Sequence, residues 1–246
     1  MVVIGVIPAR YSSTRFAGKV IADIGGKPMV QHVWERAKQA KTLEDIIIAC
    51  DDQRVYDIAR EFGAKAILTS KDHLCGTDRI IEIVNPLDVR IVVNIQGDEP
   101  LVHPTMIDSV AQALLDDEKL AMATIIKRIE DQQVVNDPNV VKVVVDKNNF
   151  ALYFSRAVIP HLAQNSELRS ARYYKHIGLY AYTKDFLFVY KNLPVSSLEK
   201  TEKLEQLRVL EEGFRIKAIE TKYDTVGVDT PEDLERVKGL LSAGSL

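Results

Sequence analysis

The chain has 246 residues, 46% hydrophobic and 27% charged, and its 32 basic and 35 acidic side chains leave a formal net charge of −3. A chain of this length and composition can bury the core of one large α/β domain. The net charge is near neutral and there is no block of one sign. This disfavours a protein that coats nucleic acid and a helix that lies on a membrane surface. An anionic ligand must therefore be held by a local cluster of cations.

The cysteine count and the apolar runs bear on the compartment. Cys50 and Cys75 are the only cysteines and form no CxxC pair, which disfavours a disulfide framework and a structural zinc site. No apolar run approaches the about 20 residues that a membrane-spanning helix needs. The strand-like run at 2–7 has no basic leader before it. We therefore expect a cytoplasmic protein without a membrane partner.

The first half of the chain alternates short β-branched runs with segments of helical periodicity. Buried strands are predicted at 2–7, 46–49, 66–68 and 91–95, and helices at 29–41, 53–62 and 78–84. This alternation predicts an α/β fold with a Rossmann-like, mostly parallel sheet, helices on both faces and right-handed crossovers.

The second half is richer in strand signals. The predicted elements are a hairpin at 140–145 and 151–154 turning at 147–149, a strand at 176–182, a helix at 199–212 and a strand at 216–220. Thr230 followed by Pro231 is typical of the start of a last helix. We predict a single domain over 1–246, in which residues from about 128 to 222 add a smaller β-rich lobe.

Polar or glycine-rich sequence follows three of the predicted strands. These segments are 8–19, 72–79 and 96–100. Ligands of a doubly wound sheet bind beyond the carboxyl ends of its strands, and those ends share one edge. The three segments therefore predict a ligand site at that edge.

The first of these segments is suited to phosphate. It carries Arg10, Arg15 and Lys19 with hydroxyl side chains between them, and arginine forks and a lysine charge neutralise phosphate oxygens well. The segment matches neither GxxxxGK[ST] nor GxGxxG, which disfavours a P-loop ATPase and a dinucleotide site. From these residues alone, a solvated basic loop stays open as the alternative.

The same segment resembles a family signature. Residues 7–19 are similar to the PARxxSTRxxxK loop of the sugar nucleotidyltransferases that use 3-deoxy-manno-octulosonate (Kdo), the Kdo cytidylyltransferases or CMP-Kdo synthetases. Further similar segments follow in order at 92–100, 141–144, 151–156, 176–180, 204–208 and 227–234. The resemblance implies the nucleotidyltransferase fold and transfer of CMP from CTP to the anomeric hydroxyl of Kdo. It also implies a role in lipopolysaccharide synthesis and a homodimer formed through the lobe.

The resemblance also implies which residues bind the nucleotide. The positions corresponding to phosphate-binding residues are Arg10, Ser13, Arg15 and Lys19, and those beside the cytidine are Pro8, Ala9, Cys75 and Gly76. Many family members have serine where this chain has Cys75, so a backbone contact is the one that would survive there. Lys19, Arg10, Arg15 and Asp98 form the expected catalytic set.

Two aspartates correspond to the family's metal ligands, Asp98 and Asp229. Mg²⁺ prefers one or two carboxylates completed by phosphate oxygens and water, so an aspartate facing the phosphate loop is chemically apt. Asp229 directly precedes the Thr230 cap, so pairing with the helix dipole is an alternative role for it. We expect Mg²⁺ as the cofactor.

The expected sugar-binding residues are Arg79, Gln96, His176, Tyr180, Glu205 and Gln206. A sugar acid needs a cation for its carboxylate, and Arg79 could supply a two-pronged contact. An exposed helical arginine, or solvated Glu205 and Gln206 on a helix, would be the alternatives. Lys142 and Arg156 match the family as well, but no role follows from the sequence.

Two other functions stay open at this point. A related acid, such as an amino-substituted Kdo or a sialic-acid-like sugar, would use the same phosphate loop, and the difference would lie near 162–172. A non-catalytic CTP-sensing or sugar-nucleotide-binding protein could share the fold. The joint presence of Arg15, Lys19, Asp98 and Asp229 argues against it, since a binder need not keep both carboxylates.

Overall fold

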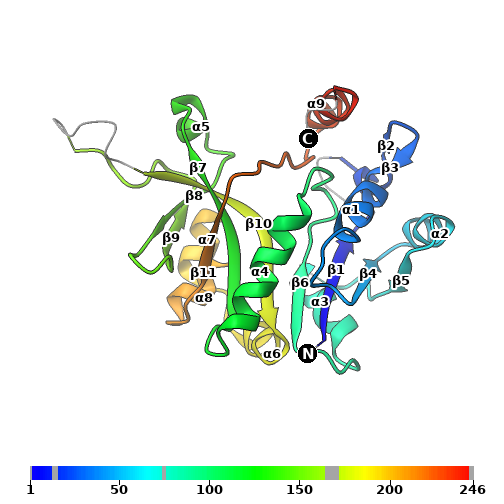
Figure 1. The fold of residues 1–246 in the computed structure, drawn as a ribbon, viewed down its shortest axis with the longest axis horizontal. Helices are drawn as coiled ribbons and strands as arrows, with labels where there is room; N and C mark the ends of the chain where they lie inside the picture. Colours follow the sequence, from blue (N-terminus) through cyan, green and yellow to red (C-terminus); the bar gives the residue numbers. More distant parts are fainter. Residues whose placement is uncertain (1, 13–15, 74–75, 164–171, 244–246) are drawn as a thin grey trace.

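A nine-stranded sheet runs through the centre of the computed structural model, which describes residues 2–12, 16–73, 76–163 and 172–243 (Figure 1). Its strands are β1 (Val3–Ala9), β4 (Asp45–Cys50), β5 (Lys65–Leu68), β6 (Ile91–Asn94), β7 (Met122–Ile129), β8 (Lys142–Val145), β9 (Ala151–Ser155), β10 (Tyr173–Thr183) and β11 (Lys217–Thr221). The predicted fold class, a mostly parallel sheet with helices on both faces, is confirmed.

Helices and one short hairpin complete the described chain. They are the 3₁₀ helix η1 (Lys19–Ile21), the hairpin β2 (Asp23–Ile24) and β3 (Lys27–Pro28), α1 (Met29–Ala37), α2 (Gln53–Glu61), α3 (Gly76–Val84), α4 (Pro104–Asp116), α5 (Gln132–Asn136), α6 (Lys184–Asn192), α7 (Ser197–Glu202), α8 (Leu207–Glu211) and α9 (Pro231–Ser242). Within the described ranges, no helix is both long and apolar enough to cross a bilayer.

The strand order is β11-β7-β10-β6-β1-β4-β5, with β8 and β9 attached beside β10. The pairs of β1 with β4 and β6, and of β4 with β5, are parallel, whereas β10 runs antiparallel between β6 and β7. The carboxyl ends of β1, β4, β5 and β6 therefore lie along one edge, where the sequence predicts the site.

Strand β1 shows why the sheet is covered on both faces. All seven of its residues are buried. Ile7 packs in the core formed with α1, α2 and α4, whereas Val6 packs in the core formed with α3 and α6. A strand buried on both sides needs an apolar run instead of alternation, which is the pattern of residues 2–7.

The predicted lobe is less separate than its range suggests. Strands β10 and β11 lie within 128–222, yet both belong to the central sheet. The β8–β9 hairpin extends that sheet from β10 and turns through Asn149 in the left-handed conformation, φ 59°. The segment therefore continues the central sheet, and α6, α7 and α8 pack against its face through apolar side chains such as Leu187 and Leu207.

The single helix predicted at 199–212 is two helices. Lys203 takes the left-handed conformation, φ 58°, and ends α7, while its N–H donates to the Glu199 carbonyl. Residues 204–206 then connect to α8. The leucine spacing suited a continuous helix, but burial of Leu204 and Leu207 is reached with the break between them.

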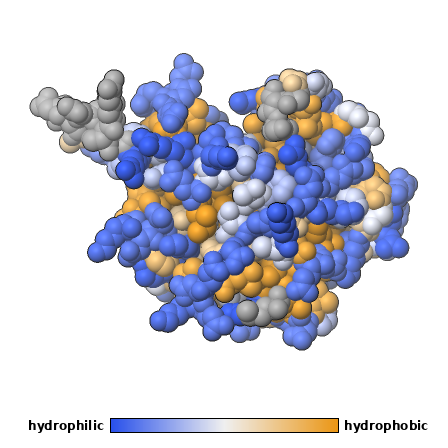
Figure 2. All heavy atoms as spheres, in the orientation of Figure 1, coloured by the Kyte–Doolittle hydropathy of each residue, from blue (hydrophilic) through white to orange (hydrophobic). Residues whose placement is uncertain are grey.

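Some elements of the structure were not predicted from the sequence. Helix α4, strand β7 and helix α6 lie in segments for which the sequence analysis predicted no element. The last helix is confirmed: Thr230 caps α9, and the Asp233 side chain completes the reciprocal capping box. Hydrophilic side chains cover much of the face in Figure 2, with apolar side chains showing between them.

Candidate active site

The loops after β1 and β6 and the start of α3 meet at Pro8. A Cβ on Gly97 would lie 2.7 Å from the Pro8 carbonyl oxygen, and a Cβ on Gly76 would lie 3.6 Å from the Pro8 side chain. Ala9, the last residue of β1, is fully buried beside them. The chain can approach itself this closely at Gly97 because glycine has no side chain. Three predicted site segments are thus in contact.

Lys19 joins the two predicted metal ligands. Its Nζ lies 2.6 Å from Asp98 Oδ2 and 2.9 Å from Asp229 Oδ1, and it donates a third hydrogen bond to the Val228 carbonyl at 2.9 Å. The side chain of Lys19 is 10% exposed, against 30% for Asp98 and 48% for Asp229. The ammonium is therefore the shielded centre of a carboxylate pair that opens to solvent.

The charge of Lys19 is set by these neighbours. Burial would by itself lower the pKa of the ammonium, but the attraction and hydrogen bonds of Asp98 and Asp229 outweigh it and raise the pKa above 10.5. Lys19 is therefore a permanent cation at neutral pH.

The carboxylate pair fits a magnesium ion that a ligand completes. Two aspartate oxygens converge on one cationic group, and Mg²⁺ commonly takes one or two carboxylates plus phosphate oxygens and water. Over the ranges that the structure describes, no three His, Cys, Asp or Glu side chains form a metal-sized cluster. Asp98 and Asp229 would supply two ligands to the ion, and phosphate oxygens or water would complete its coordination.

The segment before α9 is held so that Asp229 can reach Lys19. The Val228 N–H donates to the Asp98 carbonyl at 2.9 Å. Asp233 accepts the N–H groups of Asp229 and Thr230, both at 3.0 Å. Thr230 and Asp233 therefore cap the helix together, and the Asp229 carboxylate binds the lysine.

Glu99 contacts the same segment at Thr225 and Gly227. It accepts a hydrogen bond from the Thr225 hydroxyl, and a Cβ on Gly227 would lie 3.0 Å from its Oε1. Burial raises the pKa of Glu99 to about 7; the Thr225 hydrogen bond opposes this, and the charges of Asp98 and Asp229 add to it.

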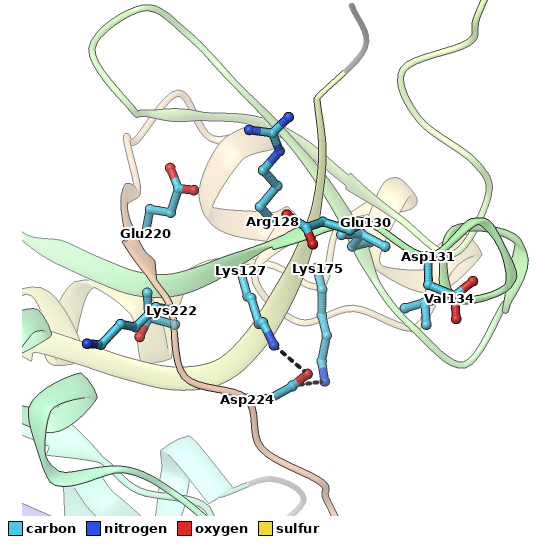
Figure 3. A pocket seen from close by; sticks show the side chains of 11 residues that line it. Lys127, Arg128, Glu130, Asp131, Val134, Lys175, Glu220, Lys222 and Asp224 are labelled. Carbon is cyan, nitrogen blue, oxygen red and sulfur yellow. Dashed lines mark hydrogen bonds and ion pairs between the residues drawn. The ribbon is translucent and has the colours of Figure 1, made fainter. Parts of the chain in front are cut away.

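A second anchor of this segment is drawn in Figure 3. Lys127 and Lys175 both point at Asp224, at 2.7 and 2.9 Å. Burial would raise the pKa of Asp224, but the two lysine hydrogen bonds outweigh it and lower the pKa to about 2. These residues line a cavity of about 760 Å³ that none of the predicted site residues lines. Its cations and carboxylates are balanced, so we assign it the structural task of fixing the chain before Thr225.

A smaller cavity, about 270 Å³, gathers five of the six predicted sugar-binding residues. They are Gln96, His176, Tyr180, Glu205 and Gln206. Asn94, Thr77, Tyr182, Tyr190 and Lys203 also line it. The break between α7 and α8 is what brings Glu205 and Gln206 to the wall, so neither is a solvated position on a regular helix.

His176 and Tyr180 line the same cavity, as expected for residues four apart on one face of β10. Burial lowers the pKa of His176 to about 3, so its ring is neutral. The Thr124 hydroxyl donates to the Leu179 carbonyl at 2.9 Å and lies 3.1 Å from His176 Nε2. With the Thr124 hydrogen on the Leu179 carbonyl, the tautomer that completes this network carries its hydrogen on Nε2 and leaves Nδ1 as the acceptor.

Gln206 carries a specific sign of a polar ligand. The residue is 6% exposed, and its side-chain Nε2 is buried with no hydrogen-bond partner among the described residues. A buried unpaired donor is costly unless a ligand or water satisfies it. The cavity wall therefore offers an unused donor.

Arg79 is placed differently from the expectation. It is fully buried and does not line the cavity. Its Nη1 donates to the Thr69 hydroxyl and to the Ser70 carbonyl at 3.1 Å, and its Nη2 lies 3.7 Å from Asp51 Oδ2. The periodicity that put Arg79 on α3 was correct, but its side chain points beneath the nucleotide-side loops.

Lys142 and Arg156 have structural roles here. The fully buried Lys142 ammonium donates to the carbonyls of Asp137, Val140 and Arg156 at 2.8, 2.6 and 2.7 Å. The Arg156 Nε donates to the Glu202 carbonyl at 3.2 Å. Both residues tie the β8–β9 hairpin to its surroundings.

The remaining predicted nucleotide residues are only partly described. Arg10 is exposed directly after β1, and Ser13, Arg15 and Cys75 lie outside the described residues.

Sequence reasoning missed Asn94, although a polar residue inside the apolar run 91–95 was a signal. It also missed Tyr182, which follows Tyr180 at the spacing of one strand face.

Comparisons with known proteins identify the family of this chain. A family model described as cytidylyltransferase matches residues 4–219. The chain is 53% identical to a 3-deoxy-manno-octulosonate cytidylyltransferase of Solibacter usitatus, over 99% of this chain and 96% of the relative. It is 48% identical to one of Geotalea uraniireducens, over 96% and 98%.

A solved structure of CMP:2-keto-3-deoxy-manno-octonic acid synthetase complexed with CTP is also similar. It superimposes with a TM-score of 0.94 at 43% identity and covers 99% of this chain and 100% of that one. A cytidylyltransferase of Leptospira borgpetersenii shares the fold, with a TM-score of 0.67 at 19% identity. The chain therefore belongs to the cytidylyltransferase family and, within it, to the 3-deoxy-manno-octulosonate cytidylyltransferases.

Proposed function

We propose that this chain transfers CMP from CTP to the anomeric hydroxyl of Kdo, giving CMP-Kdo and pyrophosphate. The observation that carries the proposal is the contact of Lys19 with both Asp98 and Asp229, at the edge of the sheet where three loops meet at Pro8. Gln96, two residues before Asp98, lines a cavity suited to a polyol.

The phosphates would lie over the loop after β1. Arg10 and Lys19 supply positive charge there, and cations held in fixed positions stabilise the charge that a leaving pyrophosphate develops. Mg²⁺, held by Asp98 and Asp229, would polarise the α-phosphate as a Lewis acid when bound. Arg15 and Ser13 stay predictions from the family likeness.

The reaction itself needs no enzyme nucleophile. The anomeric oxygen of the sugar bonds to the α-phosphorus, the bond from that phosphorus to the bridging oxygen of the β-phosphate breaks, and the hydroxyl proton leaves to solvent. Positioning and charge neutralisation are sufficient sources of rate for such a displacement.

The sugar acid would occupy the cavity of about 270 Å³. Its hydroxyls meet neutral partners there, among them the His176 ring and the unpaired Gln206 donor. Its carboxylate would meet Lys203, which is the cation among the lining residues that the structure describes. Arg79 is too deeply buried to do this in the ligand-free state.

The test is pyrophosphate release with Mg²⁺ and Kdo, comparing CTP with UTP, ATP and GTP. Release with CTP alone supports the reaction, the base and the acceptor together. Release only with an amino-substituted Kdo or a sialic acid would move the acceptor and keep the metal site. CTP binding without release from any acid would overturn the catalytic proposal.

Four further properties belong to the same proposal. A homodimer through the β8–β9 region predicts a sedimentation mass of twice 27.6 kDa. A cytoplasmic location and a role in lipopolysaccharide synthesis follow from the proposed product. Loss of activity on removal of Mg²⁺ by a chelator, with recovery on its return, tests the cofactor.

A further inference from the structure

The Lys19 ammonium lies between the two predicted metal ligands, within 3 Å of one oxygen from each. Mg²⁺ binds carboxylate oxygens at about 2.1 Å, so an ion bound to these same two oxygens would take the place of Nζ. An ammonium and a divalent cation cannot share that place, because both are positively charged.

We infer that Lys19 competes with the metal for Asp98 and Asp229, so that the nucleotide-free protein binds divalent cations weakly and a triphosphate relieves the competition. This inference rests on the proposed function. It adds a direction to it: the nucleotide prepares the metal site by giving the lysine another anion to bind.

The cost of displacing Lys19 is visible in its surroundings. The side chain is 10% exposed and makes three hydrogen bonds, two of them to carboxylates. Moving it without a new partner would break two charge-assisted bonds and leave a shielded ammonium unpaired. A free metal ion must offset that loss before it binds.

A triphosphate supplies the missing partner. Lys19 begins η1 at the end of the loop after β1, where Arg10 also lies, so phosphates over this loop are within the same charged neighbourhood. A lysine can turn its ammonium from the aspartates to a phosphate because its four-carbon stem is flexible while its backbone stays in place. By linkage, whatever the nucleotide gains from a bound metal, the metal gains from the nucleotide.

A purely structural lysine makes the opposite prediction. If Lys19 only held the two aspartates together, a neutral residue would let the carboxylates separate and would leave metal affinity unchanged or weaker. If Lys19 competes, the neutral residue removes the ammonium from Asp98 and Asp229 and leaves its place open to a metal ion. The sign of the change therefore separates the two roles.

The experiment measures Mn²⁺ binding to the nucleotide-free protein by the loss of the free-ion electron paramagnetic resonance signal. We expect Lys19→Met to bind Mn²⁺ about tenfold more tightly than wild type or more, within the range of usual coupling factors. Lys19→Arg keeps the cation and should stay as weak as wild type. Lys65→Met, which removes an exposed lysine paired with Asp45, controls for the change in net charge.

Two further variants keep the test decisive. Adding Asp98→Asn to Lys19→Met should cancel the gain, which locates the bound ion. If Lys19→Met does not fold, as judged by circular dichroism, Lys19→Gln replaces it, since an amide can still donate to the Val228 carbonyl. Equal or weaker Mn²⁺ binding in the neutral variants would overturn the inference. Pyrophosphate release by the wild-type enzyme tests the proposed function separately.

Discussion

The buried guanidinium of Arg79 lies 3.7 Å from the carboxylate of Asp51, and the same carboxylate accepts the Tyr11 N–H at 2.8 Å. Asp51 follows the end of β4, Arg79 lies on α3 and Tyr11 belongs to the loop after β1. The ion pair thus links the phosphate loop to a helix that contributes Gly76 and Thr77 to the site.

Replacement of Arg79 by methionine should destabilise the protein and weaken CTP binding. It leaves the shielded Asp51 without its cation, a change that typically costs about 3 kcal/mol or more. Urea unfolding measures the loss. Because the disturbed loop is the one proposed to bind the nucleotide, the KM for CTP should rise more than the KM for Kdo.

Arg90→Met is the matched control, since Arg90 pairs with the exposed Glu118. It should change the free energy of unfolding by less than about 1 kcal/mol. A rise confined to the KM for Kdo in Arg79→Met would show instead that Arg79 reaches the sugar acid.

Replacement of Asp98 by asparagine should abolish turnover and leave the fold intact. Removing one carboxylate from the pair weakens the expected metal site, and losses of about a hundredfold or more in kcat are usual for such groups. Pyrophosphate release gives the rate and the melting curve gives the fold. The control Asp57→Asn, on the exposed side of α2, should behave as wild type. Normal activity in Asp98→Asn would show that Asp98 is not a metal ligand.

Replacement of Gly97 by alanine should affect both stability and rate. The added Cβ would lie 2.7 Å from the Pro8 carbonyl oxygen. Neither atom is at the end of a flexible side chain, so the two backbone segments must move apart. We expect a loss of about 1–3 kcal/mol, as for other overpacked sites, and a lower kcat because Asp98 is next in the chain. Gly239→Ala in α9 meets nothing within 4 Å and should stabilise the protein by up to about 1 kcal/mol.

The pH dependence of stability should carry the signature of His176. Its folded pKa of about 3 is below the unfolded value of 6.5. As the pH falls from 6.5, the unfolded chain therefore binds a proton that the folded protein does not, and stability falls. This contribution is complete above pH 6.5 and declines toward pH 3.

The variant His176→Gln removes that contribution while retaining a donor toward Thr124. Between pH 6 and 4, its free energy of unfolding should depend on pH less steeply than that of wild type, by up to about 1.4 kcal/mol per unit. Urea titrations at three pH values measure the slope, with the exposed His161→Gln as the reference for a lost histidine. An unchanged slope would mean that the ring is protonated in the folded protein.

Replacement of Lys142 by methionine should unfold the hairpin region without touching the chemistry. Three partly buried carbonyls lose their donor, which we expect to cost about 3 kcal/mol. Urea unfolding gives the magnitude, and Lys147→Met, at the exposed turn, should be neutral. Unchanged stability with a raised KM for Kdo would instead give Lys142 a role in the sugar site.

Much of the parallel half of the fold was predictable because its signals are local. The apolar run of β1 and the Thr230 cap of α9 each depend on neighbouring residues alone. The place of β10 was not predictable in this way. Its pairing with β6 joins Tyr180 to Asn94, residues far apart in the chain, and nothing in either segment states the partner.

The site residues also differ in whether their positions could be predicted from the sequence. Lys19 and Asp98 follow strands, so their positions could be inferred from the topology of the sheet. The left-handed Lys203 could not be foreseen from leucine spacing, and it is what brings Gln206 to the cavity. The inward turn of Arg79 was hidden because an arginine on a helix is compatible with solvent, ligand or core.

Strand β10 has a consequence for how the sugar cavity recognises its ligand. Eight of its eleven residues, 173–177 and 180–182, pair with β7, and the strand also pairs with β8 near one end and with β6 at the other. Amide hydrogens at 174–177 and 180–182 should therefore exchange with solvent only when the whole sheet opens. His176 and Tyr180 stand on this slow-exchanging strand. We therefore expect the cavity wall to keep its shape when a ligand binds. A sugar of the wrong stereochemistry should then bind poorly, because the wall does not rearrange to fit it.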